Sequence, residues 1–218
     1  MPNFFDVSRL HPKIGCSYEE YFYYEDIAAR RLWFNTAVEN RTESSSSGVL
    51  DCTTLLVTDM VHHIIQYNRD DAGIPIEERD PIKLYINSPG GDKYEGFSLI
   101  DAILVSDTPV WTYNVGMCAS MGFLIYIAGK KRFTFPHSMF LHHDGTNGGW
   151  GSSNKFIDTA EFDKRYDLEV VKKHVLTHTK ISEAVYEEYK RVEWYMLPKE
   201  AIELGIADAV VESMSEVL

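Results

Sequence analysis

The chain has 218 residues, of which 44% are hydrophobic and 13% aromatic. This composition excludes a disordered chain, because there is ample apolar surface to bury on folding, and the length suits one domain. A net charge of −12 excludes a general nucleic-acid-binding protein, which needs a basic surface against the phosphates.

The cysteines and the apolar runs indicate the compartment. Cys16, Cys52 and Cys118 are widely spaced and form neither a disulfide framework nor a zinc ribbon. The N-terminus lacks a basic segment followed by an apolar run, and Phe123–Ala128, the most apolar stretch, is far shorter than the roughly 20 residues that cross a bilayer. We therefore expect a reduced, cytoplasmic location and no membrane partner.

The first third of the chain contains the least regular patterns. Tyr18–Arg31 has apolar residues at mixed helical spacing, and Leu32–Phe34 is typical of a strand. Glu39–Gly48 is a serine-rich loop that cannot contribute to a core. Thr53–Tyr67 then shows the apolar spacing of a helix.

The middle of the chain alternates strands and helices. Strands are predicted at Ile82–Ile86 and Val110–Val115, and each is followed by a glycine-containing turn and then a helix, at Tyr94–Val105 and Ala119–Ala128. This alternation predicts an α/β fold with a parallel sheet covered by helices.

The last third continues the pattern. Phe133–Phe135 and Met139–His142 are predicted strands, and Asn154–Thr179 is a long, charged helix. Pro198 and Gly205 have the positions expected at the start and the end of a final helix. No boundary separates the long helix from the rest, so residues 1–218 are expected to form a single domain.

The first glycine-rich turn, Asn87–Gly91, is not a phosphate-binding loop. Gly91 and Gly96 have the P-loop spacing, but Phe97 and Ser98 stand where that loop needs Lys and Ser or Thr. Two interpretations remain: a tight strand-to-helix turn, or a backbone N–H that faces an oxyanion, which glycine permits by removing the side chain.

The second turn places Ser120 at the start of an apolar helix. A serine in this position is either an N-cap or a nucleophile beside an oxyanion-binding N–H. The turn is not the G-x-S-x-G elbow, since Cys118 stands at its first glycine position. Cys118 is expected to be a small buried residue, because nothing basic flanks it.

A nucleophilic serine needs a base, and the histidines supply the candidates. His142 and His143 end a strand, where one side chain points inward and its neighbour outward. His174 and His178 have the i, i+4 spacing of a metal pair, but they lack the glutamate of H-E-x-x-H and an obvious third ligand. We therefore expect no metal.

Four segments together carry a resemblance to a known family. The chain resembles the proteolytic subunit of the Clp protease from about Leu84 to Val211, in Leu84–Gly91, Ala119–Gly122, Arg132–His143 and Glu200–Asp208. The resemblance implies a crotonase-like α/β head with a projecting handle, here residues 148–180, and a divergent region at residues 1–50. It also implies heptameric rings stacked face to face, of this subunit alone or mixed with a second one. Unfolded polypeptides would be delivered by an AAA+ unfoldase, and the chain itself would need no cofactor.

The same resemblance assigns roles to individual residues. Ser120 would be the nucleophile, and His143 the general base by an ungapped count from Pro136; His142 would replace it only if that strand gained or lost a residue. The backbone N–H groups of Gly91 and Met121 would form the oxyanion hole. Gly148–Gly151 would begin the handle strand, and Asn154–Thr179 would be the handle helix.

One position departs from the family pattern. An ungapped count places the triad aspartate at Tyr189, and the nearest carboxylates in sequence are Glu187, Glu188 and Glu193. A phenol cannot supply the charge with which the acid orients and stabilises the histidine. A weakly active or regulatory ring subunit therefore stays open as an alternative to an active peptidase. A crotonase-type enzyme acting on acyl-CoA also stays open, because that fold shares the two N–H donors.

Overall fold

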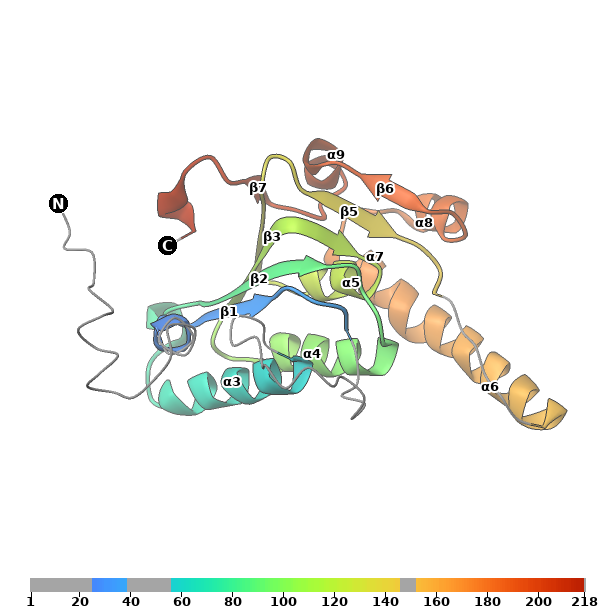
Figure 1. The fold of residues 1–218 in the computed structure, drawn as a ribbon, viewed down its shortest axis with the longest axis horizontal. Coiled ribbons are helices and arrows are strands. Elements are labelled where there is room, and N and C mark those ends of the chain that lie inside the picture. Colours follow the sequence, from blue (N-terminus) through green and yellow to red (C-terminus); the bar gives the residue numbers. More distant parts are fainter. Residues whose placement is uncertain (1–24, 39–55, 146–151, 218) are drawn as a thin grey trace, which may run out of the picture.

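The computed structural model describes residues 25–38, 56–145 and 152–217, and its centre is a seven-stranded sheet (Figure 1). Strands β1, β2, β3, β4 and β7 lie side by side in that order, and each neighbouring pair is parallel. β5 also pairs with β3 in parallel, and β6 is antiparallel to β5. The strands are β1 (Arg31–Phe34), β2 (Ile82–Ser88), β3 (Val110–Ala119), β4 (Lys131–Thr134), β5 (Met139–His142), β6 (Trp194–Met196) and β7 (Ala209–Val210).

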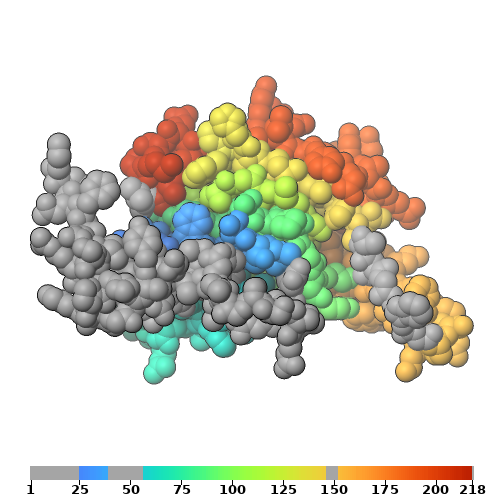
Figure 2. Space-filling model, in the orientation of Figure 1, coloured from blue at the N-terminus to red at the C-terminus, as the bar shows by residue number. Residues whose placement is uncertain are grey.

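Helices cover the sheet and extend beyond it. They are α3 (Val57–Asp70), α4 (Lys93–Val105), α5 (Met121–Ile127), α6 (Ser153–Tyr166), α7 (Lys172–His178), α8 (Glu183–Tyr189) and α9 (Pro198–Glu203). A π-helical segment, Asp167–Val171, joins α6 to α7, and short 3₁₀ turns lie at Ile76–Glu78 and Met214–Glu216. Figure 1 shows α3 and α4 along one side of the sheet, whereas α6 projects away from it. The orange surface of α6 accordingly forms one end of the molecule in Figure 2.

The two faces of the sheet bury different side chains. On one face, the alternate residues Ile82, Leu84 and Ile86 of β2 are fully buried in the core that also contains α4 and α5. On the other face, aromatic rings stack across four neighbouring strands, with centroids 4.5 to 4.9 Å apart. They are Trp33, Tyr85, Tyr113 and Phe133. The Tyr85 hydroxyl donates to the carbonyl of Val217 at 2.6 Å, so the C-terminal residues pack on this second face.

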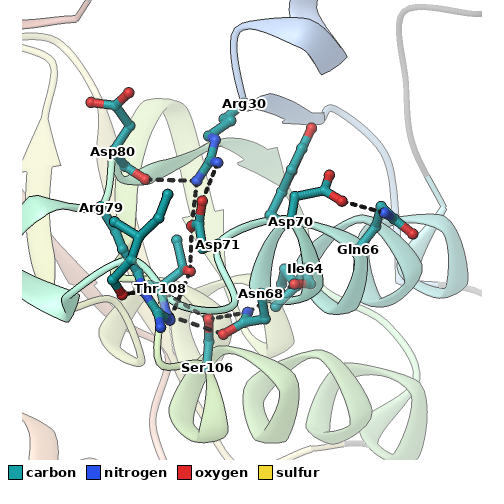
Figure 3. A network of polar contacts seen from close by, with 12 residues as sticks. Arg30, Ile64, Gln66, Asn68, Asp70, Asp71, Arg79, Asp80, Ser106 and Thr108 are labelled. Carbon is teal, nitrogen blue, oxygen red and sulfur yellow. Dashed lines mark hydrogen bonds and ion pairs between the residues drawn. The ribbon is translucent and has the colours of Figure 1, made fainter.

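A buried carboxylate lies at the N-terminal ends of the strands. Asp71, the residue after α3, accepts two hydrogen bonds from Arg30, at 2.5 and 2.7 Å, and one from the Thr108 hydroxyl at 2.7 Å (Figure 3). The Arg30 guanidinium lowers the pKa of Asp71 to about 2. Because Arg30 directly precedes β1 and Thr108 lies just before β3, these bonds fasten α3 to the sheet.

Strand β3 brings C-terminal strand ends together, at the end of the sheet opposite to Asp71. Its first half pairs with β4 through Trp111–Asn114, and its last three residues, Met117–Ala119, pair with β5. The N–H of Ser120, directly after β3, donates to the carbonyl of Leu141 at 2.9 Å. Ser120 and the end of β5 are therefore held side by side.

The predicted parallel sheet with covering helices is confirmed, and so is the final helix between Pro198 and Gly205. The helix predicted at Ala119 begins at Met121 instead, because Ala119 pairs with β5 and Ser120 has a φ of +53°, which no helix accommodates. The long helix predicted over Asn154–Thr179 is interrupted by the π-helical segment. The N-terminal segment up to residue 24, the serine-rich loop, the start of the Thr53–Tyr67 helix and the Gly148–Gly151 strand lie outside the described residues.

Candidate active site

Ser120 lies between β3 and α5 in a strained conformation. Its φ of +53° and ψ of −118° are unusual for a residue with a side chain and cost about 1–3 kcal/mol. Hydrogen bonds fix the residue on both sides: its N–H donates to Leu141, and its carbonyl accepts from the N–H groups of Phe123 and Leu124. The side chain makes no N-cap hydrogen bond. Ser120 therefore does not act as an N-cap, which was one of the two roles open to a serine at this position.

The turn after β2 lies directly against this serine. Gly90 and Gly91 have φ values of +92° and +148°, which favour glycine. A Cβ on Gly90 would lie 2.6 Å from the Cβ of Ser120 and 2.7 Å from the backbone nitrogen of Met121. A side chain at Gly90 would therefore block the space in front of Ser120. The backbone of Val38, bonded to the residues on either side of Gly91, holds the turn in place.

The two adjacent histidines separate as alternation along a strand predicts. Nε2 of His143 lies 2.9 Å from Oγ of Ser120, and the His143 side chain is about one-fifth exposed. His142 points into the core between the rings of Phe123 and Tyr186 and is 3% exposed. Burial lowers the pKa of His142 to about 4. The histidine that the ungapped count selects is thus the one that contacts the serine.

The acid that faces His143 is Glu193, the residue directly before β6. The register of β5 and β6 pairs Phe140 with Met196 and His142 with Trp194. Continued by one residue, this register places His143 opposite Glu193, and side chains opposite each other in an antiparallel pair lie in contact. Oε1 of Glu193 is 2.8 Å from Nδ1 of His143. The Glu193 side chain is 56% exposed, so this carboxylate remains in contact with solvent.

Tyr189, at the position where the count placed the aspartate, has a different role. Its ring stacks on Trp194, with centroids 4.5 Å apart. Glu187 accepts hydrogen bonds from Lys172 and Lys190, and Glu188 is exposed on α8. Of the three glutamates near this position in sequence, the one that contacts His143 is Glu193. The ungapped count along the sequence pointed to Tyr189 and not to Glu193, because such a count takes no account of the pairing of β5 with β6. The short aromatic and apolar run Trp194–Met196 before Pro198 was the signal for that strand.

The arrangement of these three side chains supports proton transfer. With the proton on Nδ1, the His143 ring donates to Glu193 and accepts from the Ser120 hydroxyl at Nε2. The carboxylate then fixes the tautomer and stabilises the imidazolium that forms when the ring takes the serine proton. Ser120, His143 and Glu193 are therefore in the geometry that nucleophilic acyl transfer requires.

The other reactive residues singled out in the sequence are engaged elsewhere. Nε2 of His174 donates to the carbonyl of Leu124 at 2.9 Å, and Nδ1 of His178 faces the carbonyl of His174. Cys118 is fully buried, and burial raises the pKa of its thiol. Within residues 25–38, 56–145 and 152–217, no group of three or more His, Cys, Asp or Glu side chains could hold a metal ion.

Comparisons with known proteins show the family of this chain. The family model described as Clp protease matches residues 75–214. The ATP-dependent Clp protease proteolytic subunit of Deinococcus radiodurans is 32% identical over 149 residues, which cover 62% of this chain and 67% of the relative. The ATP-dependent Clp protease proteolytic subunit 1 of Prochlorococcus marinus strain MIT 9312 is 30% identical over 148 residues, 63% of this chain and 72% of the relative.

The chain belongs to the Clp protease family, because the family model covers more than half of it. The resemblance recognised in the sequence is thereby confirmed, and the mixed α/β fold with its parallel sheet is the one expected of that family. In the part of the chain that the structure describes, no helix is both long and apolar enough to span a membrane.

Proposed function

We propose that this chain is the proteolytic subunit of an ATP-dependent Clp protease, a serine endopeptidase that hydrolyses peptide bonds of unfolded chains. The observation that carries the proposal is the hydrogen-bonded series Ser120–His143–Glu193, in a chain of this family. The series joins a nucleophile, a base and an orienting acid at the C-terminal ends of the strands, where catalytic groups in parallel α/β sheets gather.

In the acylation step, Oγ of Ser120 attacks the carbonyl carbon of the substrate, and its proton passes to Nε2 of His143. Glu193 holds the ring in the correct tautomer and stabilises its positive charge. His143 then gives the proton to the leaving amine, and the C–N bond breaks to leave an acyl-serine. A water molecule, deprotonated by His143, hydrolyses the ester and releases Ser120.

The oxyanion formed in each step would be bound by the N–H groups of Gly91 and Met121. Two observations support this role. The Gly90–Gly91 turn abuts Met121, and the absence of a side chain at Gly90 keeps the space in front of Ser120 free. Backbone N–H donors aimed at a developing oxyanion are a large source of transition-state stabilisation in acyl transfer.

Assembly into rings is part of the proposal. Helix α6 has no buried residue, and it exposes Phe156, Ile157 and Phe162. Large apolar side chains on a projecting helix indicate an association surface. We expect heptameric rings stacked in pairs, which receive unfolded chains from an AAA+ unfoldase that consumes the ATP. Light scattering tests this: a monodisperse species of 25.0 kDa over a range of salt and protein concentrations would contradict it.

The two alternatives receive less support. The hypothesis of a weakly active or regulatory subunit rested on the phenol of Tyr189 at the position of the aspartate. The carboxylate of Glu193 at His143 removes that reason. A crotonase-type enzyme acting on acyl-CoA has no use for a serine hydrogen-bonded to a histidine at this position.

The decisive experiment is covalent labelling with a fluorophosphonate probe, which reacts with activated serines. The wild-type protein should be labelled, and Ser120→Ala should not. Ser98→Ala, which removes an exposed serine of α4, is the matched control and should be labelled like the wild type. His143→Ala should lose labelling, whereas His142→Phe should keep it. Labelling that survives Ser120→Ala, or a wild type that is never labelled, would contradict the proposed function.

A further inference from the structure

The carboxylate that orients His143 is carried by an exposed turn. Glu193 is the last residue before β6, and the residues from Arg191 to Glu193 are exposed. An exposed glutamate side chain has several rotamers available and loses conformational entropy when it is held in one of them. Something in the fold must therefore fix the backbone of this turn, because the single hydrogen bond to Nδ1 is in contact with water.

Two aromatic rings close the turn at its ends. Tyr189 is the last residue of α8, and Trp194 is the first residue of β6. Their rings stack with centroids 4.5 Å apart and an interplanar angle of 23°. The N–H of Val192 donates to the carbonyl of Tyr189 at 3.1 Å, which tightens the same turn. Stacked aromatic pairs contribute stabilisation beyond the area that they bury.

One of the two rings is anchored in the sheet. Trp194 pairs with His142 in the β5–β6 ladder and packs against the main core. The position of Trp194 relative to His143 is therefore set by the sheet itself. Tyr189 is the last residue of α8, which is anchored earlier in the helix by the buried Tyr186, packed on His142, and by the ion pairs of Lys172 with Glu183 and Glu187. The stack thus adds a contact between the C-terminal end of α8 and the strand that directly follows Glu193.

We propose that Tyr189 is a positioning residue: its ring, stacked on Trp194, holds the turn so that the carboxylate of Glu193 stays at Nδ1 of His143. The inference rests on the proposed function and deepens it. The contribution of Tyr189 to kcat comes from its ring and not from its hydroxyl, and it acts only through Glu193. A misplacement of about 1 Å in a catalytic array lowers the rate by about 10²-fold, so loss of the ring should be visible in kcat.

The test compares hydrolysis of a small fluorogenic peptide by variants of the full chain. Tyr189→Ala should lower kcat about tenfold or more and leave KM within about twofold, since the stack contacts no substrate. Tyr189→Phe keeps the ring and should retain kcat within about twofold. Tyr195→Ala, an exposed tyrosine of β6 two residues from Glu193, is the matched control and should behave like the wild type.

A double-mutant cycle shows whether the ring acts through Glu193. In the Glu193→Gln background, Tyr189→Ala should cause no further loss of kcat, because the group that it positions is already gone. Equal losses of kcat in the wild-type and Glu193→Gln backgrounds would overturn the proposal. It would also be overturned if Tyr189→Phe were as slow as Tyr189→Ala, or if Tyr189→Ala had the wild-type kcat.

Two controls separate this proposal from the proposed function. Circular dichroism and ring assembly of Tyr189→Ala must match the wild type. If they do not, the double-mutant cycle is repeated with Tyr189→Leu, which keeps an apolar side chain but removes the stack. Failure of the fluorophosphonate to label the wild type would overturn the proposed function itself. Labelling of the wild type combined with additive losses would overturn the role of Tyr189 and leave the proposed function standing.

Discussion

The two ends of the parallel sheet contain similar pairs of groups with different consequences. At the N-terminal ends, Asp71 meets Arg30 at 2.5 Å, and the Asp71 side chain is 2% exposed (Figure 3). At the C-terminal ends, Glu193 meets His143 at 2.8 Å, and the Glu193 side chain is 56% exposed. Both contacts join a carboxylate to a nitrogen-containing side chain. The nitrogen-containing side chains are equally exposed, at 20%, so the difference lies in the carboxylates: only the one in the second contact is in contact with solvent.

The difference follows from what surrounds each carboxylate. Asp71 is bonded by Arg30 and by Thr108, which itself accepts from Arg79, so moving a proton or a side chain there would leave charges buried and unpaired. Glu193 has His143 as its partner, and His143 also reaches Ser120. A network of the first kind contributes to stability, whereas one of the second kind can pass a proton. The predictions below test this division.

The largest effect is expected at the C-terminal ends. His143→Ala should lower kcat by at least about 10³-fold and leave the free energy of unfolding nearly unchanged, because the side chain is partly exposed. Peptide hydrolysis and urea denaturation measure the two quantities. The control, His142→Phe, replaces the buried neighbour by a ring of similar size and should retain kcat within a few-fold. If His142→Phe were the inactive variant, the division between the two histidines would be wrong.

Removal of the acid tests the second contact of His143. Glu193→Gln should lower kcat by about 10²-fold or more, with about 10⁴-fold as the upper limit known for an orienting acid, and should change KM little. The control is Glu187→Gln on α8, whose carboxylate binds Lys172 and Lys190 and not the histidine; its kcat should be that of the wild type. A wild-type kcat in Glu193→Gln would mean that the site works with Ser120 and His143 alone.

At the N-terminal ends of the strands, we expect a loss of stability without a loss of kcat. Asp71→Asn leaves the Arg30 guanidinium without its carboxylate and should lower the free energy of unfolding by about 3 kcal/mol or more. In the folded protein kcat should be unchanged. Asp70→Asn is the matched control, because Asp70 is exposed and bonds to Gln66; a change within about 0.5 kcal/mol is expected. Loss of kcat in folded Asp71→Asn would show that the two ends of the sheet are coupled.

Much of the C-terminal end could be predicted from the sequence. Gly90, Gly91 and Ser120 follow short apolar runs and precede helical spacing, and such local patterns place them at strand ends on the same edge of a parallel sheet. Alternation alone predicts that one of His142 and His143 points inward and the other outward, and the ungapped count from Pro136 selects His143 as the base. These predictions need no knowledge of distant contacts.

The rest could not be predicted because it depends on pairing between distant segments. Glu193 reaches His143 through the β5–β6 register, which joins residues about fifty positions apart, and a count along the chain pointed to Tyr189 instead. The Arg30–Asp71 contact joins residues 41 positions apart, and neither residue belongs to a recognisable motif. The positive φ of Ser120 is set by its bonds to Leu141, Phe123 and Leu124, so the start of α5 was predicted two residues too early.

The smallest effect is expected from the buried histidine beside the active site. In the residues that the structure describes, Nε2 of His142 has no hydrogen-bond partner, and burial lowers the pKa of His142 to about 4. The unfolded chain binds a proton at this residue below about pH 6.5. Between about pH 6.5 and pH 4 the unfolded state therefore holds more protons than the folded state, and stability falls as the pH falls. For this residue alone, the free energy of unfolding should decrease by about 2 kcal/mol between pH 7 and pH 5.

His142→Phe tests this, because it removes the titrating group and keeps a ring between Phe123 and Tyr186. The variant should lose about 2 kcal/mol less stability than the wild type between pH 7 and pH 5, measured by urea denaturation at one fixed protein concentration. His137→Gln, at an exposed position before β5, should decline with pH as the wild type does. An equal decline in His142→Phe and the wild type would mean that the buried ring is not neutral in the folded protein. The acid sensitivity would then have to come from other groups, such as His174, whose pKa burial also lowers to about 4.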